Sequence, residues 1–406
     1  MTEFKPQTIV VLGTGYVGLP AALLLARAGH TVIGVDINEN IVRAINEGVL
    51  HIKEDKLQAI MNEPAVRANL RAQTAPTEAD IFLIAVPTPV DHRKKVAEMK
   101  YVRDATESIV PHLRPGNLII LESTVPPLTC RDFMAPILEK SGLKVGENLY
   151  LAHCPERILP GDVFYEIVHN DRIIGAADVT ARELAAAMYA SFVEGNLYQT
   201  DDVTAELCKL MENTYRDVNI ALANEFAAVA EGLGIDPVEA IELANKHPRV
   251  RILRPGIGVG GHCIPLDPWF IKEVDPQNSR LIFTSRLIND EMPGRIAGKI
   301  RKTVRDLTGP RIVCLGAAYK ANTEDPRESP ALEIVRVLRE DGYNVAHYDP
   351  LVSGYQYPEG QSLADVCRGA DMLAVLVKHA AVLDDLAAHR AAIEAALRTP
   401  LITVFG

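Results

Sequence analysis

A glycine-rich turn near the start of the chain strongly restricts how its first part can fold. Residues 13–18 read Gly-Thr-Gly-Tyr-Val-Gly and lie between a short apolar run, residues 8–12, and an amphipathic segment, residues 19–28. In such a turn the first glycine permits the sharp bend, the second admits a pyrophosphate, and the third lets helix and strand pack closely. The pattern predicts a βαβ unit with a dinucleotide at the positive end of its first helix.

An acidic residue follows at the spacing that a dinucleotide site requires. Asp36 comes directly after the second expected strand, residues 31–35. A carboxylate there accepts hydrogen bonds from ribose hydroxyls and repels a 2′-phosphate, which favours NAD over NADP. A glycine turn without a ligand is the alternative, and ordinary turn chemistry is the alternative for two threonines in later turns. The expected cofactor contacts are Gly13, Gly15, Tyr16, Val17, Gly18, Asp36, Pro87, Thr88 and Thr124.

Further apolar runs predict a parallel sheet in the first half of the chain. Residues 81–86 and 118–121 are typical of strands buried on both faces, and helical segments such as residues 41–46 separate the runs. From about residue 201 the pattern changes to a single helical repeat that lasts about thirty residues, a length typical of a helix that bridges domains or forms a dimer interface. Its apolar positions are Leu207, Met211, Val218, Leu222, Phe226, Val229 and Leu233.

Strand and helix alternate again in the last quarter of the chain, without a glycine fingerprint. The runs are residues 311–315, 330–341, 343–348 and 372–377. We therefore predict an α/β protein with two Rossmann-like, doubly wound parallel-sheet domains joined by a central helical domain. The expected boundaries are residues 1–200, 201–297 and 298–406.

Composition excludes several classes of function. The formal net charge is −11, which argues against nucleic acid or an anionic membrane as a partner. No apolar segment reaches the ~18 residues that a membrane span needs. The six cysteines are scattered without a Cys-x-x-Cys pair, so we expect reduced thiols in a cytoplasmic protein rather than a disulfide framework or a zinc site.

One cysteine lies in a second glycine-rich segment. Residues 256–263 read Gly-Ile-Gly-Val-Gly-Gly-His-Cys, so four glycines precede Cys263. Most single cysteines are buried and inert, but a loop of this kind lets a ligand approach the backbone closely. A thiolate near a nicotinamide indicates oxidation of an aldehyde through a covalent thioester.

Each polar residue near this segment has a possible structural role and a possible chemical role. Asp267 followed by Pro268 is typical of a helix N-cap with proline in the first helical position, and catalysis is the competing role. Lys209 and Asn213 lie four residues apart, hence on one face of the long helix, and Asp217 and Asn224 continue this polar stripe. A solvated helix face is the alternative for all four residues.

Together these segments resemble the nucleotide-sugar 6-dehydrogenase family, which includes UDP-glucose, GDP-mannose and UDP-N-acetylhexosamine dehydrogenases. The resemblance covers nearly the whole chain. It rests on residues 13–18, Val-Pro-Thr-Pro at 86–89, Cys-Pro-Glu-Arg at 154–157, Lys209 with Asn213, the Cys263 segment, and Lys320 with residues 325–330. It implies NAD as cofactor, a UDP-sugar as substrate, and oxidation of the sugar C6 by four electrons.

The resemblance also implies a role for each matching residue. Cys263 would be the nucleophile, Lys209 and Asn213 would stabilise the oxyanion, and Asp267 would orient Lys209 or water. Thr124 and Glu156 would position water near C6. The implied substrate contacts are Glu156, Arg157, Lys209, Asn213, Arg249, Gly260, Gly261, His262, Lys320 and Arg327.

Three of these implied contacts have alternatives. A homodimer formed through the long helix would bring Arg249 to the neighbouring subunit's site, whereas a surface arginine on a loop is the other reading. Lys320 and Arg327 would face the nucleotide or form a structural ion pair.

Within the family, the chain is most similar to members that oxidise UDP-N-acetyl-D-mannosamine. Supporting segments are residues 154–161, Asn-Asp-Arg at 170–172, residues 247–250, and His262 beside Cys263 with residues 267–270 after it. UDP-glucose enzymes usually carry a glutamate where Pro160 stands and a lysine where Leu266 stands. The last residues, 401–406, lack the acidic and basic residues with which the family normally closes its last strand.

Other functions remain open from the sequence. UDP-N-acetylglucosamine and UDP-glucose are alternative substrates within the family. A two-electron β-hydroxyacid dehydrogenase shares the sheet and long helix but does not need Cys263. A nucleotide-sensing or scaffold protein is the non-enzymatic alternative, which the presence of Cys263, Lys209 and Asn213 disfavours.

Overall fold

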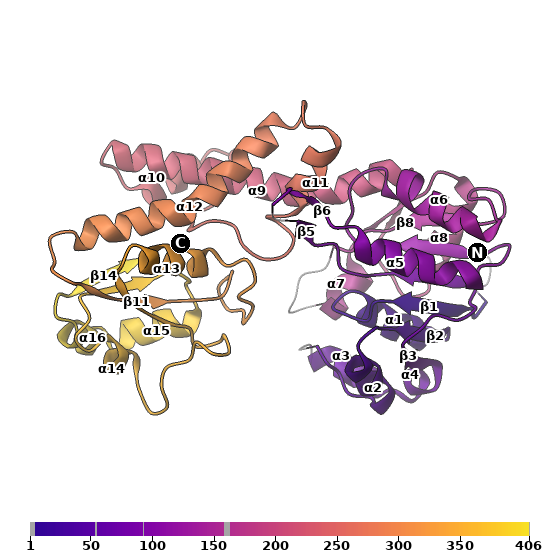
Figure 1. Ribbon diagram of the computed structural model, residues 1–406, viewed down its shortest axis with the longest axis horizontal. Helices are drawn as coiled ribbons and strands as arrows, with labels where there is room; N and C mark the ends of the chain where they lie inside the picture. The colour runs from indigo at the N-terminus through magenta and orange to yellow at the C-terminus, as the bar shows by residue number, and fades with distance from the viewer. Residues whose placement is uncertain (1–4, 53–54, 92, 158–162, 406) are drawn as a thin grey trace. The chain divides into compact units, whose positions relative to one another are not determined.

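The computed structural model describes residues 5–52, 55–91, 93–157 and 163–405 (Figure 1). The chain forms two compact units. The first comprises Met1–Glu212 and Trp269–Asp275, and the second comprises Asn213–Pro268 and Pro276–Gly406. The long helix α9 (Asp202–Gly232) passes from the first unit into the second.

The first unit is built around an eight-stranded sheet. Its strand order 3-2-1-4 is that of a dinucleotide-binding fold, continued by the strands that follow along the chain. All neighbouring pairs are parallel except β8 with β9. In spatial order the strands are β10 (Leu197–Thr200), β9 (Arg172–Gly175), β8 (Tyr150–His153), β7 (Leu118–Leu121), β4 (Ile81–Ile84), β1 (Thr8–Leu12), β2 (Thr31–Val35) and β3 (Leu70–Gln73).

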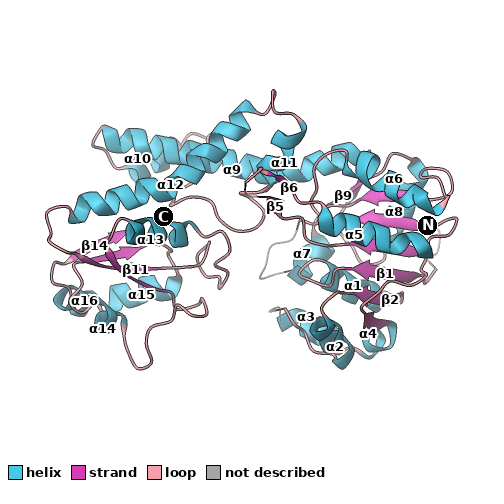
Figure 2. Ribbon diagram, viewed as in Figure 1, coloured by secondary structure: helices cyan, strands magenta, loops and turns pink. Residues whose placement is uncertain are grey.

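Helices cover both faces of this sheet because its central strands are apolar on both sides (Figure 2). Ile9 and Val11 of β1 pack in one core with α1, whereas Val10 and Leu12 pack in another core with α5. The helices are α1 (Gly18–Arg27), α2 (Glu39–Glu47), α3 (Asp55–Met61), α4 (Pro64–Asn69), α5 (Lys100–Ile109), α6 (Ala135–Leu138), α7 (Val163–His169) and α8 (Val179–Tyr189).

Short elements complete the first unit. A hairpin of β5 (Val90–Asp91) and β6 (Val96–Ala97) follows β4, and a π-helical segment at Thr129–Met134 precedes α6. Two short 3₁₀ segments lie at Val110–His112 and Glu139–Ser141.

The second unit combines helices with a smaller sheet. Its four parallel strands run in the order β12 (Asn344–Tyr348), β11 (Arg311–Leu315), β13 (Met372–Val375) and β14 (Leu401–Val404). Ile312 and Cys314 of β11 pack under α12 and α13, whereas Val313 and Leu315 pack on the opposite face. The helices are α10 (Pro237–Ala244), α12 (Arg280–Val304), α13 (Pro330–Glu340), α14 (Leu363–Cys367), α15 (Ala380–Ala388) and α16 (Arg390–Ala396), while α11 (Asp267–Val274) begins here and continues in the first unit.

The sequence predicted the fold class correctly and several elements to the residue. Strands at residues 8–12, 31–35, 118–121 and 311–315 are confirmed, as is one helix over the expected long repeat. The strands expected at 81–86 and 372–377 end two residues early, because the strands that pair with them end there. Strands β3, β8, β9 and β10 of the large sheet were not predicted; β10, for example, is short and partly exposed. The three domain boundaries stay a prediction.

Candidate active site

The glycine-rich turn of the first unit has the geometry of a ligand cradle. Gly13 has φ +87°, and a side chain there would collide with the carbonyl oxygen of Ala85. A Cβ on Gly18 would lie 1.9 Å from the Gly13 carbonyl oxygen, so helix α1 can approach the turn only with glycine at this position. A Cβ on Gly15 would meet no atom within 4 Å, which leaves the space that a pyrophosphate needs. Tyr16 is exposed, and Val17 directly precedes the N-terminus of α1.

Asp36 is tied to this turn. Its Oδ2 accepts hydrogen bonds from the backbone N–H of Thr14, at 3.1 Å, and from the Thr14 hydroxyl, at 3.0 Å. The carboxylate is only partly buried and follows β2, where a Rossmann fold holds the cofactor ribose. The residues of the turn and Asp36 therefore fit NAD. His51, which the sequence did not single out, lies near Thr14 and Asp36, and burial lowers its pKa.

The turns after β4 and β7 are joined to each other. The Thr88 hydroxyl donates to the Thr124 carbonyl oxygen at 2.6 Å, and the Ser123 hydroxyl donates to the Val86 carbonyl oxygen at 2.6 Å. Pro87 lies in the same turn and is exposed. The Thr88 hydroxyl thus has the turn-stabilising role that was the alternative to a cofactor contact, and Thr124 is held beside it.

A buried charge cluster lies at the ends of β7, β8 and β9. The Arg172 guanidinium donates to Oε2 of Glu156 at 2.6 Å, and its Nη1 lies 3.6 Å from Oε1 of Glu122. Glu156 also accepts the backbone N–H of Arg157 at 2.7 Å. The Tyr189 hydroxyl donates to Glu122, and its ring lies 4.7 Å from the guanidinium carbon. Arg172 thus holds the carboxylate of Glu156 in one place.

Glu122, the second carboxylate of the cluster, has a shifted pKa. Glu122 is 1% exposed, and its Oε2 has no hydrogen-bond partner. Burial raises the pKa of Glu122 to about 7, an effect that the Glu156 charge reinforces and that Arg172 opposes. The cluster therefore balances one arginine against one carboxylate charge, with a proton on Glu122 in acidic solution.

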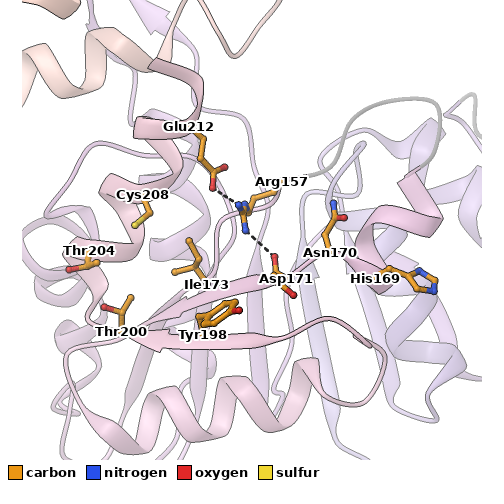
Figure 3. Close-up of a pocket in the computed structure, with 10 residues that line it drawn as sticks. All are labelled: Arg157, His169, Asn170, Asp171, Ile173, Tyr198, Thr200, Thr204, Cys208 and Glu212. Carbon is orange, nitrogen blue, oxygen red and sulfur yellow. Dashed lines mark hydrogen bonds and ion pairs between the residues drawn. The ribbon is translucent and has the colours of Figure 1, made fainter. Parts of the chain in front are cut away.

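Arg157 lines a pocket of about 880 Å³ beside this cluster (Figure 3). Its guanidinium pairs with Glu212 of α9 at 2.6 Å and donates to the Asp171 carbonyl oxygen at 3.1 Å. Figure 3 shows Arg157 between these two groups, with Thr204 and Cys208 on the same helix as Glu212. Pro160 lies outside the described residues.

In the second unit, Cys263 lies on an exposed loop that packs against another loop. All six cysteines lie in the described part of the chain, and Cys263 alone is exposed. Its carbonyl oxygen accepts the N–H groups of Leu266 and Asp267, both at 3.0 Å, which leads the chain into α11. The other thiols are less available; burial raises the pKa of both Cys154 and Cys314 to about 12.

The glycines before Cys263 let this loop approach the segment that follows β11. The N–H of Gly261 donates to the Arg327 carbonyl oxygen at 3.2 Å. A Cβ on Gly260 would lie 2.4 Å from the Glu328 carbonyl oxygen, and one on Gly261 would lie 2.9 Å from the Tyr319 ring. The expected reason for these glycines was the approach of a ligand, but packing between two loops already requires two of them.

Long-range contacts hold the rest of the cysteine loop in place. The Asn213 amide donates to Oδ2 of Asp267 at 2.6 Å, and Asp267 is 4% exposed. Helix α11 begins at Asp267 itself. An N-cap at Asp267 would instead have placed the first helical residue at Pro268. Oδ1 of Asn224 accepts the Gly256 N–H at 2.8 Å. Lys209 lies one turn before Asn213 on α9, partly buried, at the end of the first unit.

The polar stripe on α9 is not a solvated face. Asp217 and Asn224 are 0% and 1% exposed. Asp217 pairs with Arg286 of α12, and Asn289 of the same helix donates to Asp217 and accepts from Asn224. These contacts join α9 to α12 within the second unit. The alternative that Asp217 and Asn224 belong to a solvated helix face is therefore wrong. No sequence pattern identified Arg286 or Arg172 as the partner of a buried carboxylate, although Arg172 is the last residue of the Asn-Asp-Arg segment at 170–172.

The expected nucleotide-binding residues lie on the segment after β11. Lys320 is exposed, and Arg327 is exposed and bonds to Asp325 through Nε and Nη2, at 2.9 and 2.6 Å. His262 also lies near this pair; desolvation and the Arg327 charge lower its pKa. Arg249 lies in an exposed turn after α10. The second unit thus brings Cys263, His262, Gly260, Gly261 and Arg327 together, and it places Arg249 on a separate exposed turn.

Comparison with known proteins identifies three successive parts of the chain. The NAD-binding domain of the UDP-glucose/GDP-mannose dehydrogenase family matches residues 7–193, its central domain matches 203–291, and its UDP-binding domain matches 313–403. Among the described residues, no helix combines the length and apolar character that a membrane span requires.

Individual relatives agree with this assignment. A UDP-N-acetyl-D-mannosamine dehydrogenase of Methanocaldococcus jannaschii is 49% identical over 92% of this chain and 86% of its own length. An NDP-N-acetyl-D-galactosaminuronic acid dehydrogenase of Ralstonia solanacearum is 42% identical over 93% of this chain and 92% of its own length. The solved UDP-D-ManNAc dehydrogenase of Pyrococcus horikoshii superposes with a TM-score of 0.91, at 39% identity, over 98% of this chain and 95% of its own.

The three domain matches cover most of the chain in the family's order, and the glycine turn with Asp36 fits the dinucleotide. The chain therefore belongs to the UDP-glucose/GDP-mannose dehydrogenase family and is an NAD-dependent UDP-sugar dehydrogenase.

Proposed function

We propose that the protein oxidises the C6 hydroxymethyl group of UDP-N-acetyl-D-mannosamine to a carboxylate, through a thioester on Cys263. The exposure of Cys263, on a loop packed directly against the segment that carries Lys320 and Arg327, is the observation that carries the proposal. The names of the similar proteins from M. jannaschii and P. horikoshii support the choice of sugar.

The chemistry proceeds on the sulfur atom between two oxidations. Bound NAD supplies the hydride acceptor for each oxidation, so one sugar requires two NAD molecules. The Cys263 sulfur adds to the C6 aldehyde left by the first oxidation and forms a thiohemiacetal. Loss of a hydride and a proton turns this into a thioester, and water then cleaves the carbon–sulfur bond to release the uronate and the thiol.

Asn213 and Lys209 would stabilise the negative charge that develops on the C6 oxygen. Asn213 donates one amide hydrogen to Asp267, which fixes the side chain and leaves its second N–H for the substrate oxygen. Asp267 therefore orients Asn213 rather than acting alone. Loss of one such donor typically costs ~2.7–4 kcal/mol of transition-state stabilisation.

Glu156 and Thr124 would position the water for thioester hydrolysis. Arg172 fixes the position of the Glu156 carboxylate, the group that would act as a base toward water. Thr124 keeps its hydroxyl for other partners, because its turn is secured through its carbonyl oxygen. A cytoplasmic location is consistent with the cysteines, none of which forms a disulfide.

The expected homodimer is supported by apolar side chains on α9. Tyr215, Leu222, Phe226 and Val229 are between 40% and 69% exposed and recur at helical spacing. Exposed apolar surface of this kind is typical of an interface with a partner. We infer that α9 pairs with its copy in a second subunit and that Arg249 reaches the neighbouring subunit's substrate.

Phe226→Glu is expected to weaken this dimer at least about tenfold, because it places a charge in the centre of the apolar surface. Sedimentation velocity measures the effect, and activity should fall with the dimer if Arg249 acts across the interface. Glu225→Gln, at the exposed neighbouring position, is the matched control and should leave the dimer intact. A Phe226→Glu protein that stays dimeric would overturn the assignment of α9.

Counting NADH per sugar tests the proposed reaction. Two NADH for each UDP-N-acetyl-D-mannosamine consumed are expected, together with a product that carries a new carboxylate. One NADH would indicate a simple dehydrogenase, and none would indicate a sensor. The panel should include UDP-N-acetylglucosamine, UDP-glucose and UDP-N-acetylgalactosamine, since the R. solanacearum relative is named for the galacto sugar. A higher kcat/KM for any of these would change the assigned substrate.

A further inference from the structure

The two sheets carry an aspartate at the same topological position. Asp36 follows β2, which pairs with β1 in the first unit, and Asp349 follows β12, which pairs with β11 in the second unit. In a Rossmann fold this position holds the acid that binds the ribose of the nucleotide. A simple reading of the UDP-binding domain would therefore assign Asp349 to the uridine ribose.

The surroundings of Asp349 exclude that reading. Five donors already surround its carboxylate, which is 0% exposed, whereas Asp36 is partly exposed. Hydrogen bonds from His379 and from backbone N–H groups outweigh burial and hold the pKa of Asp349 well below its usual value. Its Oδ1 accepts from the N–H groups of Leu351 and Val352 at 2.8 and 3.0 Å, and its Oδ2 accepts from Ala317 N–H, Ala318 N–H and His379 Nε2 at 2.6, 3.1 and 2.9 Å.

His379 extends this network to the next part of the loop. Its Nε2 is the donor toward the Asp349 carboxylate, so Nδ1 is left as an acceptor, and it accepts the Asn322 N–H at 3.0 Å. The ring is 0% exposed. Asn322 has φ +60°, a left-handed conformation that needs such support, and its Oδ1 accepts the Ala380 N–H at 2.8 Å.

These contacts fix the backbone on both sides of Lys320. Asp349 holds Ala317 and Ala318 just before it, and His379 holds Asn322 just after it. The same loop continues to Arg327, whose carbonyl oxygen accepts the Gly261 N–H of the cysteine loop. A shift of the loop would therefore move the expected nucleotide contacts and also the support of the Cys263 segment.

We propose that Asp349 and His379 form a positioning pair for the UDP-binding loop, and that Asp349 does not contact the ribose. The acid that binds ribose in the first sheet serves in the second as a backbone anchor. The inference rests on the assignment of Lys320 and Arg327 to the nucleotide, but not on the cysteine chemistry. It predicts that loss of the His379 contact with Asn322 weakens affinity for UDP without altering affinity for NAD.

Two substitutions separate the two hydrogen bonds of His379. Asn places its oxygen near the position of Nδ1 and can still accept from Asn322, whereas Gln places its amide near Nε2 and can still donate to Asp349. Calorimetric titration with UDP should give a Kd raised about tenfold in His379→Gln and within about threefold of wild type in His379→Asn. The KM for the UDP-sugar should rise in His379→Gln by a larger factor than kcat falls.

NAD affinity and one distant histidine provide the controls. The Kd for NAD reports on the first unit and should be unchanged in both variants, and His389→Gln, at an exposed position between α15 and α16, should bind UDP as wild type does. Wild-type UDP affinity in His379→Gln, or equal weakening in both variants, would overturn the positioning role. Parallel loss of UDP affinity, NAD affinity and thermal stability would also overturn it.

A separate experiment tests whether Lys320 and Arg327 bind the nucleotide. Lys320→Ala and Arg327→Ala should each weaken UDP binding, and unchanged binding in both would remove the nucleotide from this loop. A different count of NADH per sugar would revise the proposed reaction, and it would leave these binding measurements valid.

Discussion

Cys263→Ser is expected to lower steady-state NADH production on the order of 10³-fold or more, the scale seen when a nucleophile is removed. A serine hydroxyl is far less nucleophilic than a thiolate at neutral pH, so the thiohemiacetal forms poorly. Any ester that does form hydrolyses more slowly than a thioester, so it should accumulate. Stopped-flow detection of NADH and mass spectrometry of the intact protein measure the two effects.

A second cysteine serves as the control for this prediction. Cys367 is the last residue of α14 and is fully buried, and burial raises the pKa of its thiol to about 12. Cys367→Ala should therefore lower stability modestly and leave kcat close to wild type. Steady-state activity at the wild-type level in Cys263→Ser would refute the nucleophile assignment and return the simple dehydrogenase to consideration.

Arg172→Met is expected to destabilise the first unit by about 3–5 kcal/mol, the usual cost of leaving a buried charge without its partner. The guanidinium is the cation that Glu156 and Glu122 share, and all three side chains are almost completely buried. Activity should fall further than folding alone explains, because Glu156 would lose the partner that holds its carboxylate in position. Urea denaturation and kcat at saturating UDP-sugar measure the two effects.

Glu122→Gln is the matched variant, and its effect depends on pH. Because the pKa of Glu122 is raised to about 7 in the folded protein, the folded state keeps a proton that the unfolded state has already released. Wild-type stability therefore falls as the pH rises through 7, by about 1 kcal/mol between pH 6 and 8 from this group. Glu122→Gln should lack this decline; equal slopes for both proteins would contradict the assignment of the proton to Glu122.

Local patterns in the sequence were enough to predict most of the fold. The turn at residues 13–18 requires glycine for reasons that are visible in the chain itself, and Gly13 and Gly18 meet the steric conditions that were expected. Apolar runs predicted the central strands, because a strand covered on both faces is apolar along its whole length. The long repeat on α9 was equally readable, since its period extends over 31 residues.

Local sequence patterns did not predict the edge strands or the partners of the buried charged residues. Strand β10 is partly exposed, so no apolar run marks it. Asp217 and Asn224 have the spacing of a solvated stripe, yet both are buried against α12. Arg286 provides the charge that makes this burial possible, and it comes from a segment 69 residues away along the chain.

The sequence by itself determined the α/β class, the dinucleotide turn and the cysteine segment, because each depends on residues that are neighbours in the chain. Only the tertiary structure decided which polar residues share a buried environment. It brought Arg172 to Glu156, Asp267 to Asn213, and His379 to Asp349. A buried charge is stable only with a partner, and that partner is chosen by the packing of distant elements rather than by local spacing.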